Sequence, residues 1–461
     1  MRAMWDTSVS MRTDKIRLLA LGLMLILLAG CGSVIPPLPG APAPESAISD
    51  GLEPSPETVW GIETPEPIPE PVEPTAAPAP TPAPSPEPAL EPSPAAGPTL
   101  SPSPEPDPVG NDEITAVLEQ MTFTEKAAQL FVVTPEALTG TGGPVTAAGE
   151  LTREAFDAIP VGGIVYMGDN LDSSAQTREM LSNMQSISMD RIGLPAFLCV
   201  DEEGGTVARI SGSGRFDVPE YPDMIDVGNS GQTEWARQIG AEMGAYLSDL
   251  GFNVDFAPVA DVLSNDSNTV VRYRSFGSDP QLVAEMTAAF SEGLAAEGVL
   301  AVYKHFPGHG NTAADSHAGF AESDADLDTL RQRELVPFRD GIARDVPFIM
   351  AGHISLPNVT GDGVPASLSR RILTDLIREE MGYEGIVITD ALNMGAISDN
   401  YSAGVAAVMA LEAGADMILM PADFQTAYDA VMEAIQNGTL SETRIDDSLR
   451  RILAVKLRLM A

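Results

Sequence analysis

The chain has 461 residues, 44% of them apolar and 20% charged, so it can bury a large hydrophobic core. Its formal charge of −40 argues against nucleic acid as a partner, because phosphate binding requires clustered lysines and arginines. Two cysteines exclude a disulfide framework, and 39 prolines are too many for one compact domain. The composition therefore indicates a chain made of unlike parts.

Residues 1–31 have the pattern of an export signal. Arg12, Lys15 and Arg17 precede an apolar run at 18–28 that is too short to span a bilayer as a stable helix. The run ends in LAGC, which resembles the lipobox of bacterial lipoproteins. We therefore expect a lipidated Cys31 as the mature N-terminus, a membrane anchor and a folded domain outside the cytoplasm. The alternative is an ordinary signal peptide in which this cysteine is incidental.

Residues 32–110 are a low-complexity tract. They contain 25 prolines and 12 acidic residues among 79, with no lysine or arginine. Such a segment cannot bury enough apolar surface to fold. We expect a disordered tether, extended at about 3 Å per residue where it adopts polyproline geometry.

Residues 111–461 carry a formal charge of −30 and form the predicted folded domain. Eight apolar runs of strand length recur in it, at 129–133, 161–167, 195–201, 254–261, 300–306, 347–354, 384–390 and 416–420. Amphipathic segments typical of helices lie at 173–189, 233–250, 279–298, 326–343, 369–381, 403–413 and 446–460.

The eight runs favour one particular α/β fold. They are almost continuously apolar, as in GIVIT at 385–389, which indicates strands buried on both faces of a parallel sheet. Eight βα units in about 350 residues predict a single (β/α)8 barrel rather than an open doubly wound sheet. Cys199 falls in the third run, where we expect it to be buried and inert.

Five of these runs have polar residues at or near their C-terminal ends. In chain order they are Asp201, Asp261, Lys304 with His305, His353 and Asp390. Capping of the next helix would explain one such residue, but not the set. Because active sites of (β/α)8 barrels are built at this rim, the pattern predicts a catalytic site there.

Three of the four histidines lie in the segment KHFPGHGNTAADSH, residues 304–317. Asp315 precedes His317 by two residues, so its carboxylate can accept from one ring nitrogen and leave the other for proton transfer. Surface histidines without a chemical role are one alternative. A metal site of His305, His309 and His317 is another, but the Pro-Gly between the first two prevents them from sharing a helix face. We expect no metal and no cofactor.

Several motifs, in one order along the chain, resemble glycoside hydrolase family 3 and its bacterial β-N-acetylhexosaminidase branch. They are DEEGG at 201–205, VDFAP at 254–258, RSFG at 274–277, KHFPGHG with DSH at 304–317, and LIREEMGYEGIVITDALN at 376–393. The resemblance covers essentially all of residues 111–461. It implies a glycosidase that acts on a carbohydrate.

The resemblance also implies roles for single residues. Asp390 is the expected nucleophile, because a carboxylate at a strand end can form a glycosyl ester that water later hydrolyses with retention. His317 is the expected general acid/base, oriented by Asp315. The positions that match the family's sugar-binding residues are Asp201, Arg209, Arg274, Lys304 and His305. Two positions depart from the family pattern, with Thr206 replacing a common arginine and Asn311 a common acid.

The sequence therefore predicts a retaining exo-β-N-acetylhexosaminidase that removes terminal β-N-acetylglucosamine from peptidoglycan fragments or related amino sugars. The alternatives are a single-domain β-glucosidase or xylosidase of the same family and a non-catalytic wall- or solute-binding lipoprotein. For amino sugars, the acetamido group of the substrate can replace the nucleophile if two acids act together. Asp201 and Glu202 could form that pair, but adjacent residues of an extended chain point to opposite sides.

Overall fold

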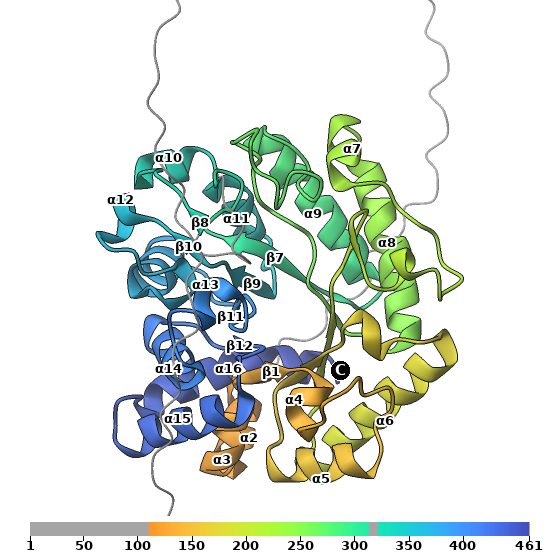
Figure 1. Ribbon diagram of the computed structural model, residues 1–461, viewed down its shortest axis with the longest axis vertical. Helices are drawn as coiled ribbons and strands as arrows, with labels where there is room; N and C mark the ends of the chain where they lie inside the picture. The colour runs from red at the N-terminus through yellow and green to blue at the C-terminus, as the bar shows by residue number, and fades with distance from the viewer. Residues whose placement is uncertain (1–109, 313–320, 461) are drawn as a thin grey trace, which may run out of the picture. The chain divides into compact units, whose positions relative to one another are not determined.

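Eight parallel strands form the centre of the domain in the computed structural model, which describes residues 110–312 and 321–460. The strands neighbour one another in the order β11-β9-β7-β6-β3-β2-β1-β12. A bridge between Ile388 and Met417, with a hydrogen bond from Thr389 N–H to the Met417 carbonyl (3.0 Å), joins the two outer strands. The sheet thus closes, and the predicted (β/α)8 barrel is confirmed (Figure 1).

Each barrel strand lies inside one of the eight predicted runs. The strands are β1 (Phe131–Val133), β2 (Gly163–Val165), β3 (Phe197–Val200), β6 (Val254–Asp255), β7 (Leu300–Phe306), β9 (Phe348–Ala351), β11 (Ile386–Thr389) and β12 (Ile418–Leu419). Every residue in them is buried except Leu300, which is partly buried. Burial on both faces explains the continuous apolar runs. Cys199 is buried, and its thiol forms no disulfide within the described residues.

Helices surround the barrel (Figure 1). They are α2 (Asn111–Gln120), α3 (Phe123–Ala128), α4 (Pro135–Thr139), α5 (Glu150–Ala158), α6 (Ser174–Ile192), α7 (Met224–Asn229), α8 (Thr233–Leu250), α9 (Pro280–Ala296), α10 (Leu327–Gln332), α11 (Leu335–Ala343), α12 (Pro357–Thr360), α13 (Gly395–Ser398), α14 (Ala403–Ala413), α15 (Phe424–Gln436) and α16 (Glu442–Arg458). Among the described residues, no helix is both long and apolar enough for a membrane span.

Two predicted helices differ from the structure. Residues 326–343 form α10 and α11 instead of one helix, because Pro337 has no N–H and its ring would clash with the carbonyl of Arg333 in a continuous helix. The segment 369–381 contains a π-helix, Arg371–Glu380, whose apolar face is buried.

Two short pairs of strands outside the barrel were not predicted. They are the antiparallel β4 (Glu202–Gly204) with β5 (Val207–Ala208), and β8 (Ala321–Glu322) with β10 (Ile354–Ser355).

Several of the predicted features lie outside the described residues. They are the signal with Cys31, the proline-rich tract up to residue 109, and the dyad of Asp315 and His317.

Lys456 of α16 is buried at the N-terminal end of the barrel. Its Nζ lies 4.9 Å from the centre of the Phe197 ring, at the start of β3. That ring packs edge-on against Phe348, at the start of β9, with 5.2 Å between ring centres. The amine has no hydrogen-bond partner among the described residues. Burial lowers the pKa of Lys456 to about 7, although nearby Cys199 acts in the opposite direction.

We expect Lys456→Met to stabilise the domain, and more at pH 6 than at pH 10. Below about pH 7 the amine is charged in both the folded and the unfolded chain, so folding bears the full free-energy cost of burying a charge. As the pH rises from about 7 to 10.5, only the unfolded chain stays protonated, and the cost falls by roughly 1.4 kcal/mol per pH unit. Thermal unfolding of both proteins at the two pH values measures the stability gained by Lys456→Met. An equal gain at pH 6 and pH 10 would contradict the prediction.

Candidate active site

The C-terminal ends of the barrel strands surround a cavity of about 660 Å³. Six of the residues predicted from the sequence line it, namely Asp201, Arg209, Arg274, Lys304, His305 and Asp390. They come from β3, β7, β11 and the loops that follow β5 and β6. The structure therefore brings these residues together, as expected for one site.

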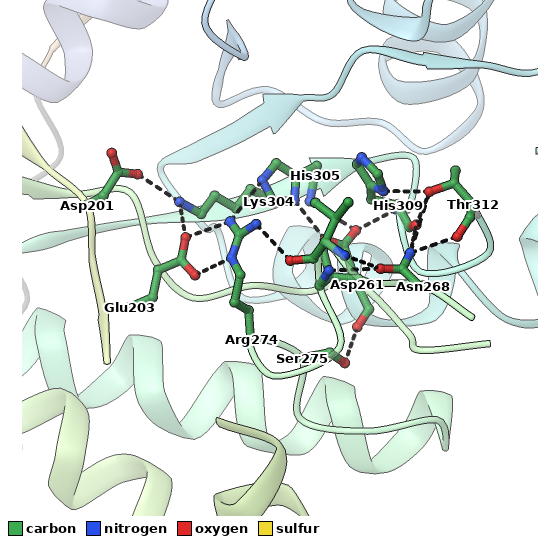
Figure 2. A network of polar contacts seen from close by, with 12 residues as sticks. Asp201, Glu203, Asp261, Asn268, Arg274, Ser275, Lys304, His305, His309 and Thr312 are labelled. Atoms are coloured by element: carbon green, nitrogen blue, oxygen red, sulfur yellow. Dashed lines mark hydrogen bonds and ion pairs between the residues drawn. The ribbon is translucent and has the colours of Figure 1, made fainter. Parts of the chain in front are cut away.

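Glu203 lies at the centre of a cluster of charges on one side of this cavity (Figure 2). Its Oε1 accepts hydrogen bonds from Lys304 Nζ (2.6 Å) and Arg274 Nη2 (2.8 Å), and its Oε2 accepts from Arg274 Nε (2.7 Å). Lys304 Nζ also donates to Asp201 Oδ1 at 2.9 Å. Two cations and two carboxylates are thus paired. Glu203 is part of the DEEGG motif, but the sequence assigned it no role.

Pairing keeps the members of this cluster charged. Burial alone would raise the pKa of Glu203, but Arg274 and Lys304 outweigh it and hold the pKa far below its usual range. For Lys304, burial lowers the pKa, but Asp201 and Glu203 outweigh that effect and raise it. The cluster therefore offers charged hydrogen-bonding groups in a fixed geometry.

Asp201 and Glu202 lie at the start of a hairpin, β4 and β5, which is joined by a tight turn. Gly205 has φ +55°, and a Cβ atom there would lie 2.6 Å from the backbone of Asp223, so the turn needs glycine. Asp201 lines the cavity, whereas Glu202 is fully buried and accepts hydrogen bonds from Ile210 N–H, Ser211 and Tyr246 Oη. The two acids diverge, as predicted.

Asp261 fixes the orientation of His305. Its Oδ2 lies 2.7 Å from His305 Nδ1, and its Oδ1 accepts from the N–H groups of His305 (3.1 Å) and His309 (2.7 Å). Burial would raise the pKa of Asp261, but His305 and His309 outweigh it and lower the pKa. An ionised Asp261 requires a proton on His305 Nδ1, so Nε2 can accept from Arg274 Nη2 at 3.4 Å. The sequence identified Asp261 at a strand end without giving it this function.

His309 is anchored behind His305. Its Nδ1 lies 2.8 Å from Thr312 Oγ1, and its carbonyl accepts from Asn268 Nδ2 at 2.9 Å. Burial is the main cause that lowers the pKa of His309, and nearby His305 adds to it. The alternative metal site also needs His317, which lies outside the described residues.

Asp390 follows β11 and is partly buried at the cavity wall. Its N–H donates to the Ala351 carbonyl (2.8 Å), and its Oδ1 accepts from Ala391 N–H (2.8 Å). Burial would raise the pKa of Asp390, but nearby His353 and His305, the Ala391 N–H and Lys304 together lower it. The carboxylate is therefore ionised at neutral pH, as a nucleophile must be.

His353 supports the turn that carries Asp390. It is buried, its Nε2 donates to the Ala391 carbonyl (2.9 Å), and its Nδ1 lies 2.8 Å from Ser367 Oγ. The signal for this residue in the sequence was its position at the end of the sixth run.

The two departures from the family pattern lie away from the cavity. Thr206 is exposed, and its N–H and hydroxyl both donate to Asp223 Oδ1, at 3.0 and 3.1 Å. Asn311 Nδ2 donates to Ser323 Oγ at 2.8 Å. Neither side chain is among the residues that line the described cavity.

Comparisons with known proteins agree on one family. Residues 122–455 match the model described as the glycosyl hydrolase family 3 N terminal domain. The chain is 34% identical over 334 residues to beta-hexosaminidase A of Pseudoalteromonas piscicida, which covers 66% of this chain and 55% of the relative. It is 36% identical over 275 residues to beta-hexosaminidase LpqI of Mycobacterium tuberculosis, and the match covers 57% of this chain and 68% of that relative.

Solved structures are similar over the same region. A glycoside hydrolase family 3 beta-N-acetylglucosaminidase from Paenibacillus sp. has a TM-score of 0.69 at 35% identity, over 74% of this chain and 63% of that chain. A beta-N-acetylhexosaminidase from Beutenbergia cavernae has a TM-score of 0.65 at 28% identity, over 73% of this chain and 99% of that chain. The chain thus spans only 55% of the Pseudoalteromonas relative and 63% of the Paenibacillus protein.

We expect Glu203→Gln to destabilise the domain by about 3 kcal/mol, because it leaves buried Lys304 and Arg274 without their shared counter-charge. Glu380→Gln is the matched control: Glu380 binds Arg331 through two hydrogen bonds of 2.8 Å, but both side chains are about one third exposed. That variant should cost less than about 1 kcal/mol. Urea unfolding compares the two, and equal losses would contradict the central role of Glu203.

Proposed function

The chain belongs to glycosyl hydrolase family 3, and on that basis we propose that it is a retaining exo-β-N-acetylhexosaminidase. It removes terminal β-N-acetylglucosamine from peptidoglycan fragments or related amino-sugar glycosides. Relatives named as beta-hexosaminidases, at 34% and 36% identity, support this choice of sugar. The observation that carries the proposal is that the Asp390 carboxylate lines one cavity with polar groups that have unused hydrogen-bonding capacity.

Three groups around the cavity can still bind hydroxyls. Lys304 Nζ has three donors, of which Asp201 and Glu203 take two. Asp201 Oδ2 lies 3.9 Å from Arg209, too far for a hydrogen bond, so it can accept from a ligand. Arg209 Nε is buried and has no partner among the described residues. Since a buried donor without a partner is costly, a ligand that supplies an acceptor there is favoured.

In the proposed reaction, an oxygen of Asp390 attacks the anomeric carbon from the face opposite the leaving oxygen. The bond to the leaving sugar breaks as the ester forms, and His317 gives its proton to the leaving oxygen. Water then attacks the same carbon, returns a proton to His317 and releases Asp390, so that the configuration is retained. The assignment of His317, with Asp315 to orient it, rests on the sequence alone.

The rival route, in which the acetamido oxygen of the substrate attacks, would need Asp201 and Glu202 to act together. Both oxygens of Glu202 already accept hydrogen bonds, from Ile210 and Ser211 beyond β5 and from Tyr246 of α8. The charge of Asp201 is likewise used, by Lys304. This arrangement supports the displacement by Asp390.

A panel of nitrophenyl glycosides tests the proposed activity. We expect turnover of β-N-acetylglucosaminide and much slower turnover of β-glucoside and β-xyloside. A preference for the latter two would favour a β-glucosidase or xylosidase of the same family. No turnover of any glycoside would favour a non-catalytic binding lipoprotein.

We expect Asp390→Asn to lower kcat by about 10³-fold or more, because an amide cannot form the glycosyl ester. A 5-fluoro glycosyl fluoride should label the native protein on the peptide that contains Asp390, as read by mass spectrometry. Asp399→Asn, an exposed change nine residues later, should keep the activity. Strong inhibition by a thiazoline analogue without a labelled peptide would favour the acetamido route instead.

We also propose that the protein is exported and anchored to the cell membrane by lipid on Cys31, with the barrel outside the cytoplasm. The support is the LAGC sequence after an apolar run of signal length. We expect Cys31→Ser to move the expressed protein from the detergent phase to the aqueous phase on partitioning, because it removes the lipidation site. Unchanged partitioning would place the anchor elsewhere.

A further inference from the structure

A second cavity, which we call the side groove, adjoins the catalytic cavity at the mouth of the barrel. It has a volume of about 490 Å³ and is lined by residues within 134–141 and 420–425, together with Asn393. These segments follow β1 and β12. Asn393 and Met420 line both the side groove and the catalytic cavity. A ligand in the catalytic cavity can therefore extend into the side groove.

The wall shared by the two cavities is held in a fixed conformation. Met420 has φ +43°, in the left-handed region that residues with side chains disfavour. Its N–H donates to the Val132 carbonyl (2.9 Å), and its carbonyl accepts from Asn393 N–H (3.0 Å). These bonds tie β1 and the start of the loop after β12 to the turn that follows Asp390. Unfavourable backbone geometry held in this way occurs most often at ligand sites.

The position of the side groove matches the direction of a leaving group. The groups proposed to bind sugar hydroxyls are Asp201, which follows β3, Arg209, which follows β5, and Lys304 on β7; β3 and β7 are separated only by β6 in the barrel. Asp390 follows β11, and the side groove follows β12 and β1, the next two strands around the barrel. In an exo-acting enzyme, the terminal sugar fills the catalytic cavity and the leaving group points out of it, towards the mouth of the barrel. The side groove opens at that mouth, next to the catalytic cavity.

The charged groups of the side groove are all acidic in its described lining, which contains no lysine or arginine. Glu136 Oε1 accepts from Val145 N–H (2.7 Å) and Asn170 Nδ2 (2.6 Å), so this carboxylate is fixed at the groove. Asp423 is exposed, and its Oδ1 caps α15 by accepting from Thr426 N–H (2.7 Å). That bond lowers the pKa of Asp423, so it is ionised at neutral pH.

The remaining polar groups of the side groove suit a sugar. Asn393 and Gln425 are exposed amides at its edge, and the amide of Asn393 has no hydrogen bond to the described residues. Thr134 and Thr141 add hydroxyls to the lining. Amides and hydroxyls can both donate to and accept from the hydroxyls of a neutral sugar.

We infer that the side groove binds the leaving group and selects an uncharged sugar over one that carries a carboxylate. This inference rests on the proposed glycosidase activity and narrows it. N-acetylmuramic acid carries a lactyl carboxylate, which Glu136 and Asp423 repel. A second N-acetylglucosamine has no charge and is accepted. The favoured substrates are therefore neutral chito-oligosaccharides rather than acidic wall fragments.

The test compares kcat/KM at pH 7 for two β-1,4 disaccharides with N-acetylglucosamine at the non-reducing end. One has N-acetylglucosamine as the leaving sugar and the other N-acetylmuramic acid; the methyl ester of the second keeps its size without its charge. We expect a preference of about fivefold for the neutral disaccharide over the acid, with the ester restored to within about twofold. The preference should shrink in about 0.5 M salt, because salt screens exposed charges.

Asp423→Asn should reduce this preference about twofold or more, since asparagine keeps the helix cap and removes the charge. Glu433→Gln is the matched control, because it also removes one negative charge from the exposed surface of α15. Glu433 lies outside the side groove, so this variant should leave the preference unchanged. Equal rates for the acid and its ester, or no effect of Asp423→Asn, would overturn the inference alone. No cleavage of either disaccharide or of a nitrophenyl β-N-acetylglucosaminide would overturn the proposed function as well.

Discussion

The buried carboxylate of Glu203 holds together the polar side of the catalytic cavity. Lys304 comes from β7 and is buried, and Arg274 comes from the loop after β6 and is partly buried; side by side, the two cations would repel. A carboxylate between them removes that repulsion and uses its two oxygens for three hydrogen bonds. The positions of Asp201 and His305 depend on the same cluster, since each contacts one of the two cations.

The two ends of the barrel treat buried charge differently. At the C-terminal end, Glu203 and Lys304 pair with each other and with Arg274 and Asp201, so these groups stay ionised and can act on a substrate. At the N-terminal end, Lys456 lies over the ring of Phe197 and has no hydrogen-bond partner among the described residues, so burial lowers its pKa to about 7. The contrast follows the general division of (β/α)8 barrels into a face for function and a face for stability.

Acidity also distinguishes the parts of the barrel mouth. Cations of the catalytic cavity are matched by Asp201 and Glu203, whereas the described lining of the side groove has carboxylates only. A folded domain with a formal charge of −30 adds a long-range negative field to that local one. Both effects act against an anionic ligand, and the local one can be changed by a single substitution.

The sequence by itself determined the eight strands, because strands buried on both faces must be apolar along their whole length. It also determined which residues end those strands, and hence that Asp201, Lys304, His305 and Asp390 would meet at one rim. Only the tertiary structure decided that Glu203 pairs with Arg274, 71 residues away, and that Lys456 is buried beneath Phe197. Local patterns report which side of an element is buried, whereas these contacts depend on how distant elements pack. The contact between the catalytic cavity and the side groove has the same origin, since Asn393 and Met420, which line both, meet only once β11 and β12 close the barrel.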